Sequence, residues 1–205
     1  MKLQAAIDRV DLADAVVLAA KLNTADIVEV GTSLIKDYGL EAVREIKKVI
    51  GTSQLLADIK TIDEGEYEFR QFFDAGADIL TVMGASSPET LEICYQVTQE
   101  YEKEMLIDLL ECSAERIAKI AHFKEAIYGM HFSKDSGRDI DVVKEVNQFI
   151  RTHPAIKRLA LAGSLNLEKV KKLQKTPLEI AIVGSAIVSS TRPANEIKKF
   201  KEVMK

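Results

Sequence analysis

The stretch Leu55-Leu56-Ala57-Asp58-Ile59-Lys60-Thr61-Ile62-Asp63 places charged residues within and just after an otherwise apolar strand pattern. Alternate side chains of a strand point to the same face, so we expect Asp58 and Lys60 to project together and Asp63 to lie in the following turn. Two explanations fit opposite charges on an inward face. One is a buried structural ion pair, and the other is a functional site at the end of the strand. The stretch alone favours neither.

Similar apolar runs recur along the chain, and a segment of helical periodicity follows each of them. Apolar positions three or four residues apart predict these helices, with Tyr67 and Phe73 on the buried face after the third strand and Ile140, Val143 and Val146 after the sixth. Ser87-Pro88 and Arg192-Pro193 are typical of helix starts. The predicted strands are residues 2–7, 26–30, 53–60, 78–82, 104–109, 126–131, 157–162 and 179–184.

Eight strand–helix units of roughly 25 residues, joined by short connections, favour a closed (β/α)8 barrel, or TIM barrel, over an open doubly wound sheet. No linker or composition shift divides the chain, so we expect residues 1–205 to form a single α/β domain.

The composition argues against several classes of protein. The 205 residues are 47% hydrophobic and 29% charged, with a formal net charge of −4, which is ordinary for a globular protein. A chain with net negative charge lacks the positive surface that binds nucleic acid or an anionic membrane. No apolar signal segment or membrane-length apolar run occurs, so a cytoplasmic location is expected. Cys94 and Cys112 lack metal-ligand spacing and are expected to be core residues.

Barrels of this class carry their chemistry where strands end and the following loops begin. The polar residues that the predicted strands place there are Asp8, Glu29, Asp58, Lys60, Asp63, Asp108 and His131, with Lys134 and Asp135 just beyond the last. His131 ends an apolar strand, where an imidazole can move a proton near neutral pH, although a hydrogen-bonded core histidine is the alternative. His122 and His153 are expected at the surface.

Two further features suggest ligands. Gly163-Ser164 and Gly184-Ser185 follow the last two strands, where loop amides of such barrels often bind phosphate, although Gly-Ser is also ordinary turn sequence. Glu29 and Asp58, on neighbouring strands, suit Mg²⁺ when water and substrate oxygens complete its octahedron. The alternative is that these carboxylates pair with Lys60 or cap helices.

Together, the quoted residues resemble the orotidine 5′-monophosphate decarboxylase superfamily, and within it the 3-hexulose-6-phosphate synthases. The resemblance runs from about residue 2 to the C-terminus. Its motifs are Ala-Ile-Asp8, Ile-Val-Glu29-Val-Gly-Thr, Ala-Asp58-Ile-Lys60-Thr-Ile-Asp63, Gly-Ala-Asp-Ile-Leu-Thr-Val-Met-Gly84, His131, Ala-Gly163 and Ile-Val-Gly184. It implies a barrel of the ribulose-phosphate-binding type.

The resemblance also implies roles for individual residues. Glu29 and Asp58 would hold Mg²⁺, Asp8 and Lys60 would contact substrate oxygens, and Asp63 would reach the partner subunit's site across a homodimer interface. Gly163, Ser164, Gly184 and Ser185 would bind the substrate phosphate. The implied reaction joins ribulose 5-phosphate to formaldehyde through an enediolate that Mg²⁺ stabilises, with His131 moving the proton.

A related decarboxylase of 3-keto-L-gulonate 6-phosphate forms the same type of enediolate by losing CO₂. Thr81-Val82-Met83-Gly84 and Asp108 resemble the synthase, and Ser185 stands where the decarboxylase pattern has arginine. The loop Phe132-Ser133-Lys134-Asp135 matches neither pattern fully, which leaves the acceptor open. A barrel that binds a sugar phosphate without catalysis is a third alternative.

Overall fold

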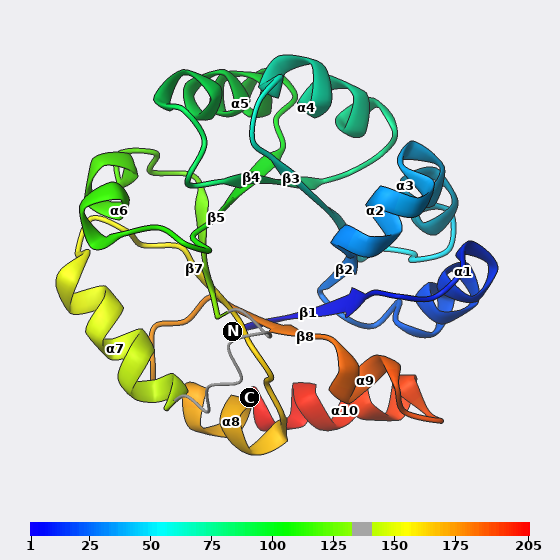
Figure 1. The fold of residues 1–205 in the computed structure, drawn as a ribbon. Helices are drawn as coiled ribbons and strands as arrows, with labels where there is room; N and C mark the ends of the chain where they lie inside the picture. The colour runs from blue at the N-terminus through cyan, green and yellow to red at the C-terminus, as the bar shows by residue number, and fades with distance from the viewer. Residues whose placement is uncertain (133–140) are drawn as a thin grey trace.

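A computed structural model, which describes residues 1–132 and 141–205, shows eight parallel strands closed into a barrel (Figure 1). Each strand pairs with the next along the chain, and β8 pairs with β1. The closed barrel that the sequence predicts is therefore confirmed. The strands are β1 Lys2–Ile7, β2 Ile27–Val30, β3 Gln54–Thr61, β4 Ile79–Met83, β5 Glu104–Asp108, β6 Ile127–His131, β7 Leu159–Ala162 and β8 Ile180–Val183.

Helices surround the barrel (Figure 1). The proline-marked starts are confirmed, since α5 begins at Pro88 with Ser87 as its cap and α10 begins at Pro193. The helices are α1 Leu12–Lys21, α2 Thr32–Tyr38, α3 Leu40–Lys47, α4 Gly65–Asp74, α5 Pro88–Glu100, α6 Ala114–Ile120, α7 Val142–Thr152, α8 Leu167–Leu173, α9 Ser185–Val188 and α10 Pro193–Val203. Ile140, which the sequence assigned to the seventh helix, lies outside the described residues.

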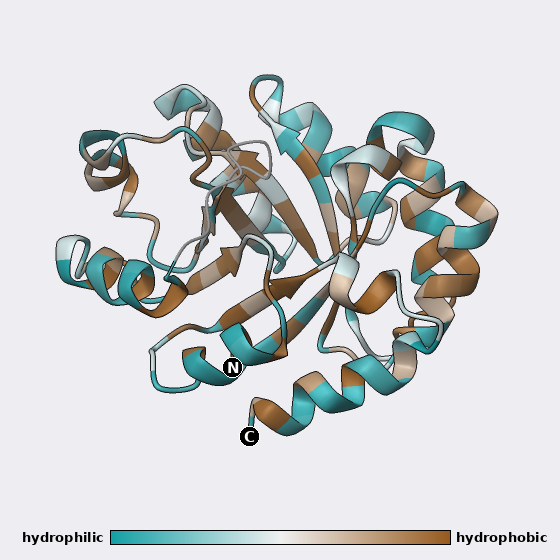
Figure 2. Cartoon of the chain, turned by 60° about the horizontal axis from the view of Figure 1, so that its bottom comes forward, coloured by the Kyte–Doolittle hydropathy of each residue, from teal (hydrophilic) through white to brown (hydrophobic). Residues whose placement is uncertain are grey.

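The barrel interior is filled by layers of four side chains from alternate strands. The strand register forms one layer from the even strands, with Ile27, Ile79, Ile127 and Ile180. The odd strands supply the next layer, with Gln4, Leu56, Leu106 and Ala160. Apolar residues dominate the strands (Figure 2). Packing therefore closes the barrel below the strand ends, and polar side chains gather above it.

Two predictions of burial are wrong. Tyr67 is 66% exposed, and Phe69 and Phe73, one helical turn apart, form the buried face of α4 instead. His153 is buried at the end of α7, where its ring lies 4.8 Å from that of Phe149.

The predictions for His122 and Cys94 are confirmed, and Cys112 lies at the edge of the core. His122 is exposed, as predicted. Both cysteines are free thiols, with Cys94 buried and Cys112 half-buried. Within residues 1–132 and 141–205, we find no helix with the length and hydropathy needed to cross a bilayer.

Candidate active site

The end of β3 departs from regular strand geometry where its charged residues lie. Ala57 pairs with Leu80 and Thr61 pairs with Val82, so the run between these pairs is longer on β3 than on β4, as in a β-bulge. Lys60 has a φ of 49°, in the left-handed region that a lysine seldom adopts. Such backbone conformations cluster at functional sites.

Contacts with Thr81 of β4 hold this bulge in place. The Lys60 backbone N–H donates to Thr81 Oγ1 over 2.9 Å, and Thr81 Oγ1 donates to Asp58 Oδ1 over 2.8 Å. Lys60 Nζ lies 3.1 Å from the same Asp58 oxygen. The prediction that Asp58 and Lys60 project together is confirmed, although a bulge rather than regular alternation brings them together.

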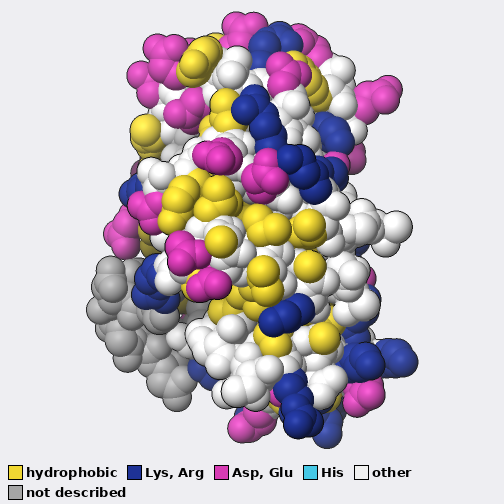
Figure 3. Space-filling view, turned by 90° about the vertical axis from the view of Figure 1, so that its right-hand side faces the viewer, with side chains coloured by type: hydrophobic (Ala, Val, Ile, Leu, Met, Phe, Trp, Pro, Cys, Tyr) yellow, Lys and Arg dark blue, Asp and Glu magenta, His cyan; other side chains and the backbone are white. Residues whose placement is uncertain are grey.

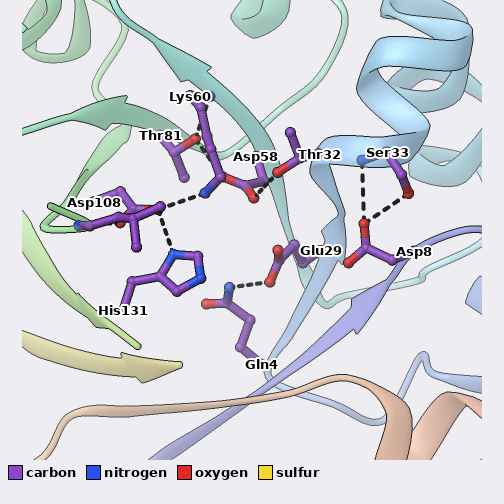
Figure 4. A network of polar contacts seen from close by, with 11 residues as sticks. Gln4, Asp8, Glu29, Thr32, Ser33, Asp58, Lys60, Thr81, Asp108 and His131 are labelled. Atoms are coloured by element: carbon purple, nitrogen blue, oxygen red, sulfur yellow. Dashed lines mark hydrogen bonds and ion pairs between the residues drawn. The ribbon is translucent and has the colours of Figure 1, made fainter. Parts of the chain in front are cut away.

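Asp108, at the end of β5, joins residues from β3 and β6 (Figure 4). Its Oδ2 lies 2.6 Å from Lys60 Nζ and 2.9 Å from His131 Nδ1. Burial alone would raise the pKa of Asp108, but the hydrogen bond from His131 and the charge of Lys60 lower it to about 2. Burial alone would lower the pKa of Lys60, but Asp58 and Asp108 raise it above its usual range. Lys60 is therefore a fixed positive charge between two carboxylates.

Glu29, on β2, is a buried carboxylate that interacts electrostatically with Asp58. Gln4 Nε2 donates to Glu29 Oε2 over 2.6 Å (Figure 4). Burial, and then the negative charge of Asp58, raise the pKa of Glu29 to about 8, although the hydrogen bond from Gln4 acts to lower it. Two buried carboxylates that repel each other, on neighbouring strands, fit an oxygen-ligated divalent cation such as Mg²⁺.

This pair leaves coordination positions for other ligands. Within the part of the chain that the structure describes, no three or more His, Cys, Asp or Glu side chains form a cage that could hold a metal by themselves. Mg²⁺ usually keeps several waters and takes only one or two protein carboxylates. Glu29 and Asp58 together form a ligand pair that Mg²⁺ accepts when water or substrate oxygens take the remaining positions.

The start of α2 orients two of the carboxylates. Asp8 Oδ1 accepts hydrogen bonds from Ser33 Oγ over 2.9 Å and from Ser33 N over 3.3 Å. Thr32 Oγ1 donates to Asp58 Oδ2 over 2.5 Å. A Cβ at Gly31, just before them, would lie 2.3 Å from Asp8 Oδ1 and would displace that carboxylate. The first turn of α2 thus bridges the ends of β1 and β3.

One cavity of about 810 Å³ is lined by every described residue to which the sequence assigned a role, except for Asp63. This volume suits a small-molecule ligand. The gathered residues are Asp8, Glu29, Asp58, Lys60, His131, Gly163, Ser164, Gly184 and Ser185.

Asp63 is exposed in the turn after β3, where the sequence placed it, but it does not line the cavity. Two apolar residues near it in the sequence are also exposed, Ile62 by 56% and Tyr67 by 66%. Lys134 and Asp135, predicted just beyond His131, lie outside the described residues.

Several residues of the network were not assigned a role from the sequence. Asp108 was recognised at a strand end, but its contacts with Lys60 and His131 join residues far apart in the chain. Gln4 and Thr81 were not identified as site residues, although each is a polar residue inside an apolar strand run. A buried polar residue in such a run requires a hydrogen-bond partner, and that pattern is the signal that could have found them.

Comparisons with known proteins find similar chains. The model of the orotidine 5′-phosphate decarboxylase / HUMPS family matches residues 1–200. A 3-hexulose-6-phosphate synthase of Mycobacterium gastri is 31% identical, over 98% of this chain and 98% of that protein. The structure of 3-hexulose-6-phosphate synthase from Salmonella typhimurium is 30% identical with a TM-score of 0.90, covering 100% of this chain and 98% of that chain.

A related decarboxylase has the same fold. The structure of 3-keto-L-gulonate-6-phosphate decarboxylase from Vibrio cholerae is 25% identical with a TM-score of 0.85, covering 99% of this chain and 96% of that chain. The likeness to both kinds of enzyme therefore extends over nearly the whole chain.

Proposed function

The chain belongs to the orotidine 5′-phosphate decarboxylase / HUMPS family, and we propose that it is a Mg²⁺-dependent aldolase that condenses ribulose 5-phosphate with formaldehyde to 3-hexulose 6-phosphate. The observation that carries the proposal is the full-length similarity to 3-hexulose-6-phosphate synthases, at 31% identity to one relative and 30% to one solved structure. The cavity geometry supports the same chemistry.

Charge at the cavity suits an enediolate intermediate. Glu29 and Asp58 would hold Mg²⁺, which when bound supplies positive charge for the developing oxyanion. The Lys60 ammonium faces the same cavity and adds a second positive charge. Asp8, held by Ser33, is placed to accept a hydrogen bond from a substrate hydroxyl.

His131 is suited to move the proton. Because an ionised Asp108 only accepts hydrogen bonds, Nδ1 of His131 carries the hydrogen in their contact and Nε2 is left to act as a base. The C1–H bond of ribulose 5-phosphate would break with its proton moving to Nε2. C1 of the enediolate would then form a bond to the carbon of formaldehyde, and the new alkoxide would take the proton.

The ends of β7 and β8 suit the phosphate. Gly163, Ser164, Gly184 and Ser185 line the cavity there. Backbone N–H groups and serine hydroxyls are common donors to phosphate oxygens, and glycine permits a close approach. The reacting carbons would then lie toward Lys60 and His131.

A direct assay tests the proposal. Purified protein with Mg²⁺ should consume ribulose 5-phosphate only when formaldehyde is present, with hexulose phosphate formed in equal amount. Asp58→Ala should abolish both turnover and its dependence on Mg²⁺. Consumption of ribulose 5-phosphate that is independent of formaldehyde, or none at all, would contradict the aldolase assignment.

The alternative is decarboxylation of 3-keto-L-gulonate 6-phosphate, which the likeness to the Vibrio cholerae enzyme favours. The same cavity would then stabilise an enediolate formed by loss of CO₂. Release of CO₂ from the keto acid, with no use of formaldehyde, would establish this second function in place of the first.

We also propose that two copies of the chain share their sites, with Asp63 of one subunit serving the other. Asp63 is exposed, and so are two apolar residues near it in the sequence, Ile62 and Tyr67, whose contact with water is unfavourable. Hydrophobic side chains also gather on the face that carries α1, α2 and α3 (Figure 3), where Val17 is 55% exposed. These surfaces suit a second copy of the chain.

A further inference from the structure

Gln4 is a polar side chain in an apolar layer of the barrel. It is only 1% exposed, and the strand register places it level with Leu56, Leu106 and Ala160. Leucine or methionine would fill this position without burying an amide, and burying an amide costs free energy unless it is hydrogen-bonded. The amide therefore calls for an explanation other than packing.

Only one end of this amide is satisfied. Nε2 donates to Glu29 Oε2 over 2.6 Å, whereas Oε1 has no hydrogen-bond partner, unlike any other buried side-chain oxygen or nitrogen in the described residues. Leaving such an atom unmatched costs the free energy of removing it from water. The amide is therefore oriented so that its N–H group binds Glu29 while its own carbonyl oxygen has no hydrogen-bond partner.

The position of Gln4 allows it to fix one oxygen of Glu29 from below. A small cavity of about 40 Å³ lies among Gln4, Glu29 and Asp58, beneath the main cavity. A donor on Oε2 restricts rotation of the carboxylate and leaves Oε1 of Glu29 to bind a ligand. Partners of this kind, behind metal ligands, set the orientation of the ligand and often its affinity for the metal.

We propose that Gln4 is a positioning residue that holds the Glu29 carboxylate in the orientation needed to bind the divalent cation. This inference rests on the proposed metal role of Glu29 and extends it to a residue that would not touch metal or substrate. Gln4 acts through Glu29 alone, so its loss should weaken metal binding without removing any group from the reacting atoms.

The test measures Mn²⁺ binding directly, by the loss of the free-ion signal in electron paramagnetic resonance, and needs no turnover. Gln4→Met keeps the length and volume of the side chain but lacks the amide, and we expect a loss of roughly 10–100-fold in Mn²⁺ affinity. Gln4→Asn keeps an amide too short to reach Glu29 and should show the same loss. Leu106→Met, in the same layer, is the matched control and should bind Mn²⁺ as the unchanged protein does.

Thermal unfolding without metal separates this effect from misfolding. Gln4→Met should unfold in one cooperative transition near the melting temperature of the unchanged protein, because loss of the unmatched carbonyl offsets loss of the hydrogen bond to Glu29. Unchanged Mn²⁺ affinity in folded Gln4→Met would overturn the inference while leaving the proposed function intact. Unchanged affinity in Glu29→Gln would instead overturn the metal role of Glu29, and the role of Gln4 with it.

Discussion

At the scale of single residues, Lys60 determines the charge balance of the site. It contacts Asp58 and Asp108 together, so Lys60→Met would leave two carboxylates facing each other and remove a positive charge from the cavity. We expect kcat/KM for formaldehyde-dependent consumption of ribulose 5-phosphate to fall by about 100-fold or more.

A second lysine offers a matched control for this substitution. Lys103 Nζ lies 2.7 Å from Asp78 Oδ1 at the opposite end of the barrel. Lys103→Met should lower the melting temperature but leave kcat/KM unchanged. Equal losses of kcat/KM in both variants would mean that stability, rather than the site, explains the effect of Lys60.

Glu29 gives the protein a pH dependence that a bound cation should remove. Its pKa is about 8 in the folded chain against an ordinary value of 4.5. Between these values the folded state holds a proton that the unfolded state releases, so the stability of the metal-free protein should fall as pH rises from about 4.5 to about 8. Mg²⁺ competes with that proton, and it should raise the melting temperature more at pH 8 than at pH 6.

Glu29→Gln provides the comparison, because the amide does not titrate. In that variant the extra stabilisation by Mg²⁺ at pH 8 should disappear. An effect of Mg²⁺ on the melting temperature that is equal at both pH values in the unchanged protein would contradict the prediction.

At the scale of elements, the bulge in β3 depends on β4 through Thr81. Thr81→Val keeps the shape of the side chain but removes the acceptor for Lys60 N and the donor to Asp58. We expect a loss of about 1–3 kcal/mol in the free energy of unfolding, measured by urea denaturation, together with weaker Mn²⁺ binding.

Thr98→Val is the control for this effect. Thr98 is also buried, and its hydroxyl donates to Cys94 O over 2.7 Å within α5. It should cost stability without changing Mn²⁺ affinity. If Thr81→Val also leaves Mn²⁺ affinity unchanged, the bulge does not orient Asp58.

The elements differ in how well the sequence predicts them. Strand positions were predicted to within about two residues, because buried parallel strands are short apolar runs bounded by polar segments. Helix α2 was missed, since it is only seven residues long and Gly39 alone separates it from α3. The bulge around Lys60 was missed as well, because nothing in an alternating pattern marks where register shifts.

At the scale of the whole molecule, a parallel barrel explains why so much of the site could be predicted. Every strand ends at the same rim, so polar residues at strand ends gather whatever their separation in the chain. The sequence does not show which of these residues form hydrogen bonds or ion pairs with one another. The contact of Asp108 with His131, for example, depends on side-chain geometry between strands. The sequence therefore predicts which residues form the site better than it predicts the contacts between them.

Sharing of sites between two subunits makes a prediction that concerns the whole assembly. Lys60→Met and Asp63→Ala should each be nearly inactive alone, but a mixed dimer would contain one site with both native residues. After subunit exchange in an equal mixture, roughly a quarter of the native activity should return, because half of the dimers would each have one intact site.

The control mixture is Lys60→Met with Glu29→Gln, two residues that line the same cavity of one chain. Every site in its mixed dimers carries one of the two defects, so no activity should return. Exchange is followed by labelling the two variants with different fluorophores. If the labels exchange and the mixture of Lys60→Met with Asp63→Ala remains as inactive as this control, Asp63 does not act in the partner's site.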